Sequence, residues 1–415
     1  MAKARRPPSI RIFMNQDWTN KEIILRSLLA EAQQHEVGCI LLSNGFEDKH
    51  GQYEVLAGFG AKEEYETLAN LPENQFCMGF CSYDLKNSFE NLQSPLPKPL
   101  DIPDVYFFEP INTFKWHRGS ANPEINFDLP SPLRISQKPM PQIEFAASTS
   151  RETYLANVDA IRDCIRHGDF YEMNYCLQFQ ADTTVDPYEL FYRLNKQAPA
   201  PFAAFFKFHD RYLLCASPER FLARRGDKLI AQPIKGTRKR LANPEEDNAI
   251  KEALFNSEKD RAENIMIVDL MRNDLSRVCK PGSVDVSELC GIYSYSHVHQ
   301  MISTVTGNLS SDNGIQDILK ATFPMGSMTG APKIQVMKDI QRFEDFSRGW
   351  YSGSLGYLDK GVFDLNVVIR TMQYDAGSEK LYYHVGGAIT YDSNGEEELA
   401  ECMHKAAGML AALRD

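Results

Sequence analysis

Two pairs of carboxylates, each with its members three residues apart in a predicted helix, are the clearest chemical signal in this sequence of 415 residues. Asp260 and Glu263 lie in the helical stretch 257–277, on the same side as its apolar residues. Burying an ionised carboxylate alone is costly, so this pair requires a nearby cation, a base or a shifted pKa, unless that end of the helix faces water. Glu398 and Glu401 repeat the spacing in the last helix, where a solvated charged face is the alternative. The two pairs could share one hard cation.

A lysine and a glutamate flank a predicted β-hairpin that turns at Gly226-Asp227. A three-residue loop over 226–228 would place Glu219 opposite Lys235 on one face of the sheet, whereas a two-residue loop would place them on opposite faces. The sequence is compatible with both. Because three basic residues follow at 238–240, Lys235 could also be a surface lysine of a basic loop.

Two further features suit a small anion. Glycines precede Pro332, which we expect to be the first residue of a helix, so the backbone N–H groups of Gly330 and its neighbours could receive an anion there. No Gly-Lys-Ser/Thr follows the glycines, as a Walker phosphate loop would require, and a small carboxylate therefore fits better than a nucleotide. Arg370 closes an alternating strand and is suited to bidentate binding of a carboxylate.

The composition limits the partners and the compartment. The net charge of −11 argues against nucleic acid or an anionic membrane as the main partner, and no apolar run approaches the roughly 20 residues that span a bilayer. The basic N-terminus lacks the apolar stretch of a signal peptide. The nine cysteines are scattered singly without a CxxC pair, which favours a reducing cytoplasm over a disulfide framework or a zinc site.

Proline content marks the main division of the chain. The segment 95–141 holds 10 of the 22 prolines, too many for a helix or an inner strand, and we interpret it as a connection or an excursion along a sheet edge. The part before it combines a helix over 21–34 with strand-like stretches at 37–43 and 74–92. The expected domains are an N-terminal region over 1–94, a proline-rich connection over 95–145 and a C-terminal domain over 146–415.

Helices and strands are mixed in the C-terminal domain. An amphipathic helix over 151–166 is followed by a strand over 170–180 and by further strands, among them a long antiparallel pair over 283–309. His297 and His299 would share a strand face there, which suits a metal, although surface or hydrogen-bonded histidines give the same pattern. Three strands and a helix close the chain. On that helix the expected core stripe is Leu399, Cys402, Met403, Ala406 and Leu410, with Glu398, Glu401 and Lys405 on another side.

Seven motifs, in this order, give the chain a resemblance to a known family. They are SPERF (217–221), PIKGTR (233–238), AENIMIVDLMRNDL (262–275), GSMTGAPK (326–333), GWYSGSLGY (349–357), NVVIRT (366–371) and the acidic segment of the last helix with Lys405. Together they resemble the chorismate-utilising enzymes, most closely component I of aminodeoxychorismate synthase, also called para-aminobenzoate synthase. The resemblance implies an α+β fold, a large sandwich of two antiparallel β-sheets with flanking helices, into which the N-terminal region packs.

The resemblance also assigns roles to individual residues. It implies that Glu263 and Glu401 are ligands of a Mg²⁺ ion that grips the ring carboxylate of chorismate, with Asp260 and Glu398 supporting them. An all-oxygen site completed by water and substrate suits this ion. The resemblance also places Lys405, Gly386 and Gly387 at the ring carboxylate. At the enolpyruvyl carboxylate it places Arg370 and Tyr351, together with Thr329 and Gly330 of the Gly326–Gly330 turn.

Lys235 separates the subfamilies within this resemblance. Component I of anthranilate synthase typically carries Ala at this position of PIKGT. In aminodeoxychorismate synthases the lysine is thought to add to C2 of the ring as the 4-hydroxyl leaves, after which ammonia adds at C4 and the lysine departs. Because only a neutral amine can add, we expect burial or the nearby Mg²⁺ to lower the pKa of Lys235. Glu219 is the candidate acid that protonates the leaving hydroxyl.

Two positions depart from the family pattern. Relatives usually carry Gln at position 172, or Lys in the water-adding isochorismate and salicylate synthases, whereas this chain has Glu172. This residue argues against a water-activating lysine and alters the charge of the pocket. Gln300 stands where anthranilate synthases have His. The alternative functions are anthranilate synthase component I and isochorismate synthase, and these two residues point away from both.

The resemblance implies a partner as well. None of the nine cysteines lies in the tight glycine turn of a glutaminase nucleophile, so we expect a separate glutamine amidotransferase subunit to deliver ammonia. No lyase segment follows before Asp415, and the expected product is 4-amino-4-deoxychorismate, formed in a transaminase-class amination on the way to 4-aminobenzoate and folate. A catalytically silent scaffold that binds an amidotransferase is the third interpretation.

Overall fold

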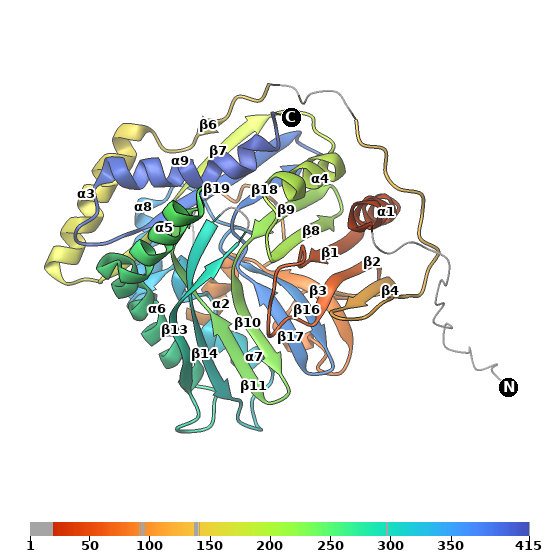
Figure 1. Cartoon of the computed structure of the whole chain (residues 1–415), viewed down its shortest axis with the longest axis horizontal. Helices are drawn as coiled ribbons and strands as arrows, with labels where there is room; N and C mark the ends of the chain where they lie inside the picture. The colour runs from red at the N-terminus through yellow and green to blue at the C-terminus, as the bar shows by residue number, and fades with distance from the viewer. Residues whose placement is uncertain are drawn as a thin grey trace.

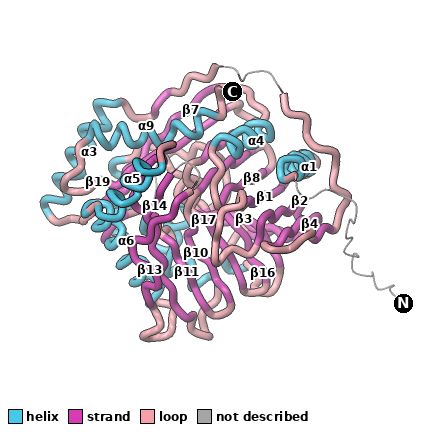
Figure 2. The backbone as a smooth tube through the Cα atoms, in the orientation of Figure 1, coloured by secondary structure: helices cyan, strands magenta, loops and turns pink. Residues whose placement is uncertain are grey.

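The computed structural model describes residues 20–90, 92, 96–136, 140, 142–295 and 298–414. Within these ranges the chain forms an α+β fold, in which long antiparallel strands build the centre and helices lie outside (Figure 1). Figure 2 shows the same division, with strands through the interior and helices at the periphery.

The helices and strands have the following bounds. The α-helices are α1 (Lys21–Gln33), α2 (Lys86–Glu90), α3 (Arg151–His167), α4 (Pro187–Gln197), α5 (Pro244–Asn256), α6 (Glu258–Ser276), α7 (Ile315–Thr322), α8 (Lys333–Phe343) and α9 (Gly395–Ala411), with short 3-10 turns η1 (Leu68–Asn70), η2 (Tyr83–Leu85) and η3 (Gly326–Met328). The strands are β1 (Val37–Leu42), β2 (Tyr53–Tyr65), β3 (Phe76–Cys81), β4 (Val105–His117), β5 (Glu124–Ile125), β6 (Ala146–Ala147), β7 (Glu172–Asp182), β8 (Phe202–Phe208), β9 (Arg211–Ser217), β10 (Arg220–Arg225), β11 (Lys228–Gln232), β12 (Ile234–Lys239), β13 (Asp285–Ser294), β14 (Val298–Asn308), β15 (Gly330–Ala331), β16 (Ser354–Asp359), β17 (Val362–Asn366), β18 (Thr371–Asp375) and β19 (Lys380–Ile389).

The strands pair antiparallel into one continuous ladder. Its order is β14-β11-β10-β17-β16-β3-β4-β2-β1-β8-β9-β18-β19-β7. β12 and β13 pair with β14, β5 with β4, and β6 and β15 with β7. The four N-terminal strands thus lie in the middle of the ladder, between strands of the C-terminal domain, as expected for a single packed body.

The ladder folds over into two packed layers. Phe80 of β3 meets Phe206 of β8 edge-on, with ring centroids 5.3 Å apart, and Tyr106 of β4 meets Phe208 at 4.7 Å. Several strands separate these partners along the ladder, so the β3–β4 part must lie face to face with the β8–β9 part. A shared apolar core fills the space between them. The expected two-sheet sandwich is confirmed, and β1 and β2 join its two sheets along one edge.

Helices cover the outer faces of both layers. α1, α3, α4, α8 and α9 share a core with the part of the ladder that runs from β8 to β7. α6 and α7 share another with the opposite part, through Ile267, Met271 and Ile318. Figure 1 shows α3 and α9 over β19 and β7, with α5 and α6 beside β13 and β14. α9 therefore lies at the β7 end of the ladder and α6 at the β14 end, and α6 also lies beside β15, which pairs with β7.

Strong N-caps start these two helices. The Ser257 side chain accepts a hydrogen bond from the N–H of Asp260 at the start of α6, and Asn394 accepts from the N–H groups of Glu396 and Glu397 at the start of α9. The acids therefore gather near helix N-termini, where the aligned peptide dipoles favour negative charge. This placement lowers the cost of concentrating carboxylates at one site.

The expectation that the proline-rich segment lacks an inner strand is wrong. β4 runs for 13 residues through it and pairs with both β2 and β3. The strand contains one proline, Pro110, at a place where the pairing with β2 shifts register between Ala61 and Glu63. A proline is tolerated at such an irregularity because no regular ladder hydrogen bond is lost. β2 itself was not predicted from the sequence.

Most other expected elements are present close to their predicted bounds, including α1, α3, β1, β7 and the long β13–β14 pair. On α9, Cys402 and Ala406 are buried as expected, but Met403 is 41% exposed, so that part of the predicted stripe is wrong. Pro332 is the N-cap of α8 and not its first residue. The domain boundaries at 94 and 145 stay a prediction. Among the described residues, no helix combines the length and the apolar character needed to cross a bilayer.

Candidate active site

Lys235 lies near the start of β12 and is surrounded by carboxylates. Its Nζ donates a hydrogen bond of 2.7 Å to Oε1 of Glu172, the first residue of β7, and the two side chains are 10% and 1% exposed. Glu219 and Glu263 lie close enough to shift the pKa of Lys235 by their charge. We call Glu172, Glu219 and Glu263 the carboxylate cluster. The interpretation of Lys235 as a surface lysine is therefore wrong.

The pKa of Lys235 is raised, contrary to the expectation that burial lowers it. Burial by itself would lower the pKa, but the charges of Glu172, Glu263 and Glu219 and the hydrogen bond to Glu172 outweigh it. The lysine is thus held as an ammonium ion in the protein as the structure has it. It must lose a proton before it can act as a nucleophile.

Glu219 faces Lys235 although the hairpin between them has the shorter loop. β10 and β11 pair Arg225 with Lys228, which leaves a loop of two residues. That register alone would place Glu219 and Lys235 on opposite faces. A shift in the pairing within β10 changes the parity, and the charge of Lys235 reaches Glu219 strongly enough to affect its pKa. The two side chains therefore belong to one site.

Glu219 holds its proton near neutral pH. Burial raises the pKa of Glu219 to about 7, against the opposing effects of a hydrogen bond from Ser327 and the charge of Lys235. The Ser327 hydroxyl donates to Oε1 of Glu219 at 2.7 Å. A buried carboxyl with such a pKa can give up or take a proton at neutral pH, which is what acid catalysis requires.

Glu263 of α6 is half-buried and has no cation of its own within ion-pair distance in the described part of the chain. Burial raises its pKa to about 7; Lys235 opposes this shift and Glu172 adds to it. Asp260, one turn earlier, differs because it accepts a hydrogen bond of 2.6 Å from Arg238. The two acids of α6 are therefore unequal: Glu263 carries uncompensated charge and Asp260 is paired.

The acids of α9 lie beside those of α6. Lys259 of α6 comes within 3.9 Å of Glu398, which is buried. Glu401 forms an ion pair of 2.8 Å with Lys405, and its pKa is lowered: burial would raise it, but Lys405, Lys259 and Lys235 outweigh burial. One acid of each pair, Glu263 on α6 and Glu401 on α9, thus lies close enough to Lys235 for the lysine charge to act on its pKa.

A divalent ion fits this arrangement through its chemistry. In the described ranges no three His, Cys, Asp or Glu side chains come together as a ready-made metal cage. Mg²⁺ does not need one, because it is commonly bound by one or two carboxylates and completes its coordination with waters and substrate oxygens. The uncompensated carboxylate of Glu263, whose pKa is raised to about 7, is a donor that a cation would relieve. Glu401 of α9 lies within reach of the charges of Lys235 and Lys259, the same two lysines that act on Glu263.

The Gly326–Gly330 turn packs directly against β7. Gly330 has a φ of 141°, and a Cβ there would lie 2.0 Å from the carbonyl oxygen of Glu172, so this position requires glycine. Thr329 is fully buried, and its hydroxyl donates to a backbone carbonyl just before the turn at 3.2 Å. The turn therefore forms one wall of the site beside the carboxylate cluster.

Arg348 fixes this turn and was missed by the sequence analysis. It is 1% exposed and donates to the carbonyl oxygens of Met328, at 2.7 Å, and Asn174, at 2.8 Å. Its charge is neutralised by an ion pair with Glu344, four residues earlier, in which Nη2 lies 2.5 Å from Oε1. That i, i+4 spacing was the available signal. Lys259 and Ser327 were missed as well, although Lys259 directly precedes Asp260 and Ser327 lies in the GSMTGAPK motif.

Arg370 is partly buried, and its guanidinium has no acidic partner within ion-pair distance in the described residues. The strand predicted to end at Arg370 is interrupted between β17 and β18, and Arg370 lies in the gap with a φ of 55°. Burial lowers its pKa. Tyr351, which lies near Arg370, is buried and stacks on His384 with ring centroids 5.0 Å apart. An unpaired, partly buried cation beside an aromatic wall suits an incoming carboxylate.

Gly386 and Gly387 lie on β19 opposite the side chains of α9. Lys405 donates a hydrogen bond of 2.8 Å to the carbonyl oxygen of Gly386. A Cβ on Gly387 would lie 3.2 Å from Oε2 of Glu398 and 4.0 Å from Nζ of Lys405. The structure thus brings together the residues predicted for the ring carboxylate, and their role stays a prediction.

The strand histidines give no support for a second metal site. His297 lies outside the described residues. His299 is buried, with one ring nitrogen 3.0 Å from Asp247 and the other 2.8 Å from Ser294. The hydrogen-bonded alternative is therefore the one that the structure has for His299.

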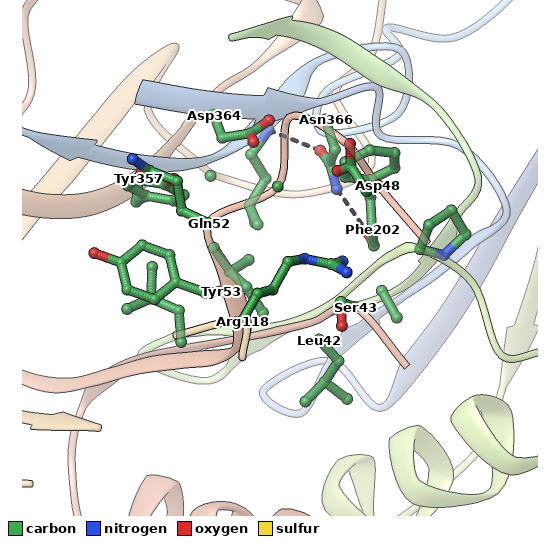
Figure 3. Close-up of a pocket in the computed structure, with 17 residues that line it drawn as sticks. Leu42, Ser43, Asp48, Gln52, Tyr53, Arg118, Phe202, Tyr357, Asp364 and Asn366 are labelled. Carbon is green, nitrogen blue, oxygen red and sulfur yellow. Dashed lines mark hydrogen bonds between the residues drawn. The ribbon is translucent and has the colours of Figure 1, made fainter. Parts of the chain in front are cut away.

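A second hollow, which we call the N-terminal cavity, lies between β1, β2, β8, β16 and β17. Figure 3 shows Arg118 extending between Ser43 on one side and Asp48 on the other. Asn366 bridges two elements of its wall, accepting from the N–H of Leu355 at 3.0 Å and donating to a carbonyl oxygen of β8 at 3.2 Å (Figure 3). None of the predicted site residues lines this cavity.

Comparison with known proteins agrees with this fold and this set of motifs. A family model described as chorismate binding enzyme matches residues 27–411. The chain is 36% identical to aminodeoxychorismate synthase component 1 of Salmonella typhimurium, over 83% of this chain and 78% of that protein. It is 35% identical to anthranilate synthase component 1 of Saccharolobus solfataricus, over 81% of this chain and 80% of that protein.

A solved structure extends the agreement to three dimensions. The crystal structure of anthranilate synthase component I from Streptococcus pneumoniae matches with a TM-score of 0.73 and 28% sequence identity, covering 82% of this chain and 81% of that one. The family model spans nearly the whole chain and the motifs converge on one site. This chain therefore belongs to the family of chorismate-binding enzymes.

Proposed function

We propose that this protein is component I of an aminodeoxychorismate synthase, which aminates chorismate at C4 to give 4-amino-4-deoxychorismate. The observation that carries the proposal is Lys235, buried in the carboxylate cluster and facing Glu219. Identities of 36% to an aminodeoxychorismate synthase and 35% to an anthranilate synthase do not separate the two reactions. Lys235 does, because the family resemblance places alanine there in anthranilate synthases.

The chemistry divides between C2 and C4 of the ring. The neutral amine of Lys235 forms a bond to C2, the ring double bonds shift, and the C4–O bond breaks. Glu219 gives its proton to the departing hydroxyl, which leaves as water. Ammonia then bonds to C4, the double bonds shift back, and the C2–N bond breaks to release the lysine. Since the pKa of Glu219 is raised to about 7, the ionised Glu219 can take a proton from the ammonium group formed at C4.

Separate groups hold the two carboxylates of the substrate. Arg370, which has no acid of its own among the described residues, would bind the enolpyruvyl carboxylate beside the Gly326–Gly330 turn. Lys405 and the backbone of Gly387 would face the ring carboxylate. Mg²⁺ held by Glu263 and Glu401 would supply the positive charge that offsets this carboxylate.

Ammonia would come from a separate glutamine amidotransferase subunit. The name component 1 of the Salmonella relative supports a second component. We therefore class the reaction as a transaminase-type amination, in which the amino group of glutamine reaches chorismate through ammonia. Free ammonium is expected to replace the partner less efficiently, and the product is expected to serve 4-aminobenzoate and folate synthesis.

Product analysis tests the proposal. The purified protein is incubated with chorismate, ammonium and Mg²⁺, and the products are separated and identified by mass spectrometry. We expect 4-amino-4-deoxychorismate, which an added lyase converts to 4-aminobenzoate, and loss of turnover with EDTA. Adding an amidotransferase subunit and glutamine should raise the rate. Anthranilate fluorescence without a lyase, or isochorismate as the product, would contradict the proposal.

A further inference from the structure

Glu172 is the nearest ionic neighbour of Lys235, and the reaction above gives it no task. Its Oε1 accepts the 2.7 Å hydrogen bond from Nζ, and its side chain is 1% exposed. The backbone holds it in place: residue 172 pairs with Ala331 of β15, and the lack of a Cβ at Gly330 lets that strand approach within contact of the Glu172 carbonyl. The pairing of β7 with β15 therefore fixes the backbone of Glu172 beside Lys235.

The second oxygen of Glu172 has no partner. Oε2 is buried and accepts no hydrogen bond from the described residues. A buried carboxylate oxygen left without a partner is costly. Glu172 therefore keeps one free acceptor position beside the oxygen that already contacts Nζ of Lys235.

The other acids near Lys235 have different tasks. Glu219 gives its proton to the departing hydroxyl at C4, and its hydrogen bond comes from Ser327 and not from Nζ of Lys235. Glu263 on α6 and Glu401 on α9 face the predicted cation. Glu172 is the one acid of the described residues in hydrogen-bond contact with Nζ.

We propose that Glu172 is a catalytic base that takes the proton from Nζ of Lys235, which lets the lysine add to the substrate, and returns it when the lysine leaves. This inference rests on the proposed function, in which Lys235 is the nucleophile. One N–H bond of the ammonium breaks and one O–H bond forms on Glu172. The buried ion pair becomes a neutral amine and a neutral acid, and the freed electron pair of Nζ forms the bond to C2. When the C2–N bond breaks, the amine recovers the same proton.

An electrostatic role for Glu172 makes the opposite prediction. If its charge only holds Lys235 as an ammonium ion, then removing the charge frees the amine and speeds the reaction. If Glu172 is the base, removing the charge still frees the amine toward external reagents but slows turnover, because no group that can take a proton remains in contact with Nζ. Two measurements on one variant therefore separate the two roles.

The test compares wild type with Glu172→Gln, which keeps the shape of the side chain and an oxygen that can accept from Nζ. Ammonium-dependent kcat is measured from pH 6 to 9, and the rate of carbamylation of Lys235 by cyanate is followed by peptide mass spectrometry. We expect kcat to fall on the order of 10²-fold, the usual size of acid–base assistance, while carbamylation at neutral pH becomes several-fold faster. The other ionisable groups that face Lys235, namely Glu219, Glu263 and Glu401, are unchanged in this variant.

Glu54→Gln is the matched control, since it removes a carboxylate that pairs with another lysine, Lys21, at 3.2 Å. It should leave both rates at their wild-type values. Turnover of Glu172→Gln that equals or exceeds wild type would overturn the assignment of the base. If that variant does not fold, Glu172→Asp, which withdraws the carboxylate by one methylene, should lower kcat about tenfold without changing KM. A wild-type kcat for it would overturn the assignment equally.

The two levels of the proposal fail in different ways. If wild type makes no 4-amino-4-deoxychorismate, or if Lys235→Ala retains the activity, the proposed function itself is wrong. If wild type makes the product, Lys235 is required and Glu172→Gln still turns over at full rate, only the role of Glu172 is wrong.

Discussion

Two regions of this protein, the wall of the N-terminal cavity and the carboxylate cluster, hold acids whose charge is compensated in opposite ways. Asp48 and Asp364 line the N-terminal cavity, and Arg220 donates to Asp48 at 3.1 and 2.5 Å and to Asp364 at 2.8 and 2.9 Å. Burial alone would raise the pKa of Asp48, but Arg220 lowers it to about 2. In the carboxylate cluster, burial raises the pKa values of Glu219 and Glu263 to about 7.

The difference separates scaffold from site. Where the chain supplies its own arginine, the acids are paired and hold strands together. Where three glutamates share Lys235, negative charge is left over for a cation, a proton or a leaving group. Glu219 and Arg220 are neighbours in the SPERF motif, and successive side chains of an extended strand point to opposite faces. Glu219 therefore belongs to the carboxylate cluster, while Arg220 pairs with the acids at the N-terminal cavity.

Replacing the lysine should have the largest effect. Lys235→Ala removes the nucleophile, and we expect amination of chorismate to fall by at least about 10³-fold, since no other amine is placed to form the bond to C2. Product formation with ammonium and Mg²⁺ measures the loss. Lys62→Ala, which removes a lysine paired with Glu109 at 2.6 Å, is the control and should keep full activity.

Glu219→Gln removes the acid at C4 and should lower kcat on the order of 10²-fold. Because the pKa of Glu219 is raised to about 7, the protonated form is lost as the pH rises through 7, so wild-type activity should decline on the alkaline side. The variant should lack this decline. A pH profile of kcat/KM for both proteins checks the assignment, and an unchanged alkaline limb in the variant would argue against it.

Asp48→Asn weakens the paired cavity. The folded pKa of Asp48 is about 2, below the ordinary 3.8, so the ionised group contributes stability above pH 3.8 that is lost as the pH falls through 2. We expect the free energy of unfolding to drop by about 2 kcal/mol at pH 7, with a smaller difference in acid. Urea unfolding measures this. A large loss of amination would contradict the separation of the two cavities.

Glu263→Gln should change the free energy of unfolding in the opposite direction to Asp48→Asn. The folded pKa of Glu263 is about 7, above the ordinary 4.5, so its ionised form costs stability that is absent below pH 4.5 and complete above pH 7. Without Mg²⁺ we expect the variant to be more stable by about 1–2 kcal/mol at pH 8 and equal to wild type at pH 4. Mg²⁺ with chorismate should raise the Tm of wild type only. A Glu263→Gln variant that is less stable than wild type at pH 8 would contradict the contrast between the carboxylate cluster and the paired acids at the N-terminal cavity.

Local patterns predicted much of this fold from the sequence. The periodicity of α3 identified this helix because one of its faces is buried. β7 and β14 were recognised as strands although both of their faces are buried along most of their length. β4 escaped because its flanking prolines suggested a connection, while the strand itself contains a single one at an irregular pairing. Hydrophobic pattern shows that a face is covered, but not which distant strand covers it.

The site was predictable in its residues but less so in its electrostatics. The acids, the glycine turn and Lys235 could be chosen from type and spacing together with family motifs. The raised pKa of Lys235 could not, because it depends on Glu172 of β7 and Glu263 of α6, which meet the lysine only after the sheet closes. The relation of Glu219 to Lys235 depended on a register shift within β10 that no turn rule predicts.

The most direct test of the central claim is to trap the covalent adduct between Lys235 and the substrate. Wild-type protein is mixed with chorismate and Mg²⁺ without ammonia, quenched in acid within the time of one turnover, digested and analysed by mass spectrometry. The account predicts an adduct on Lys235 equal to chorismate less one water, absent from Glu219→Gln. An unmodified Lys235 in a preparation that forms 4-amino-4-deoxychorismate once ammonium is added would contradict it.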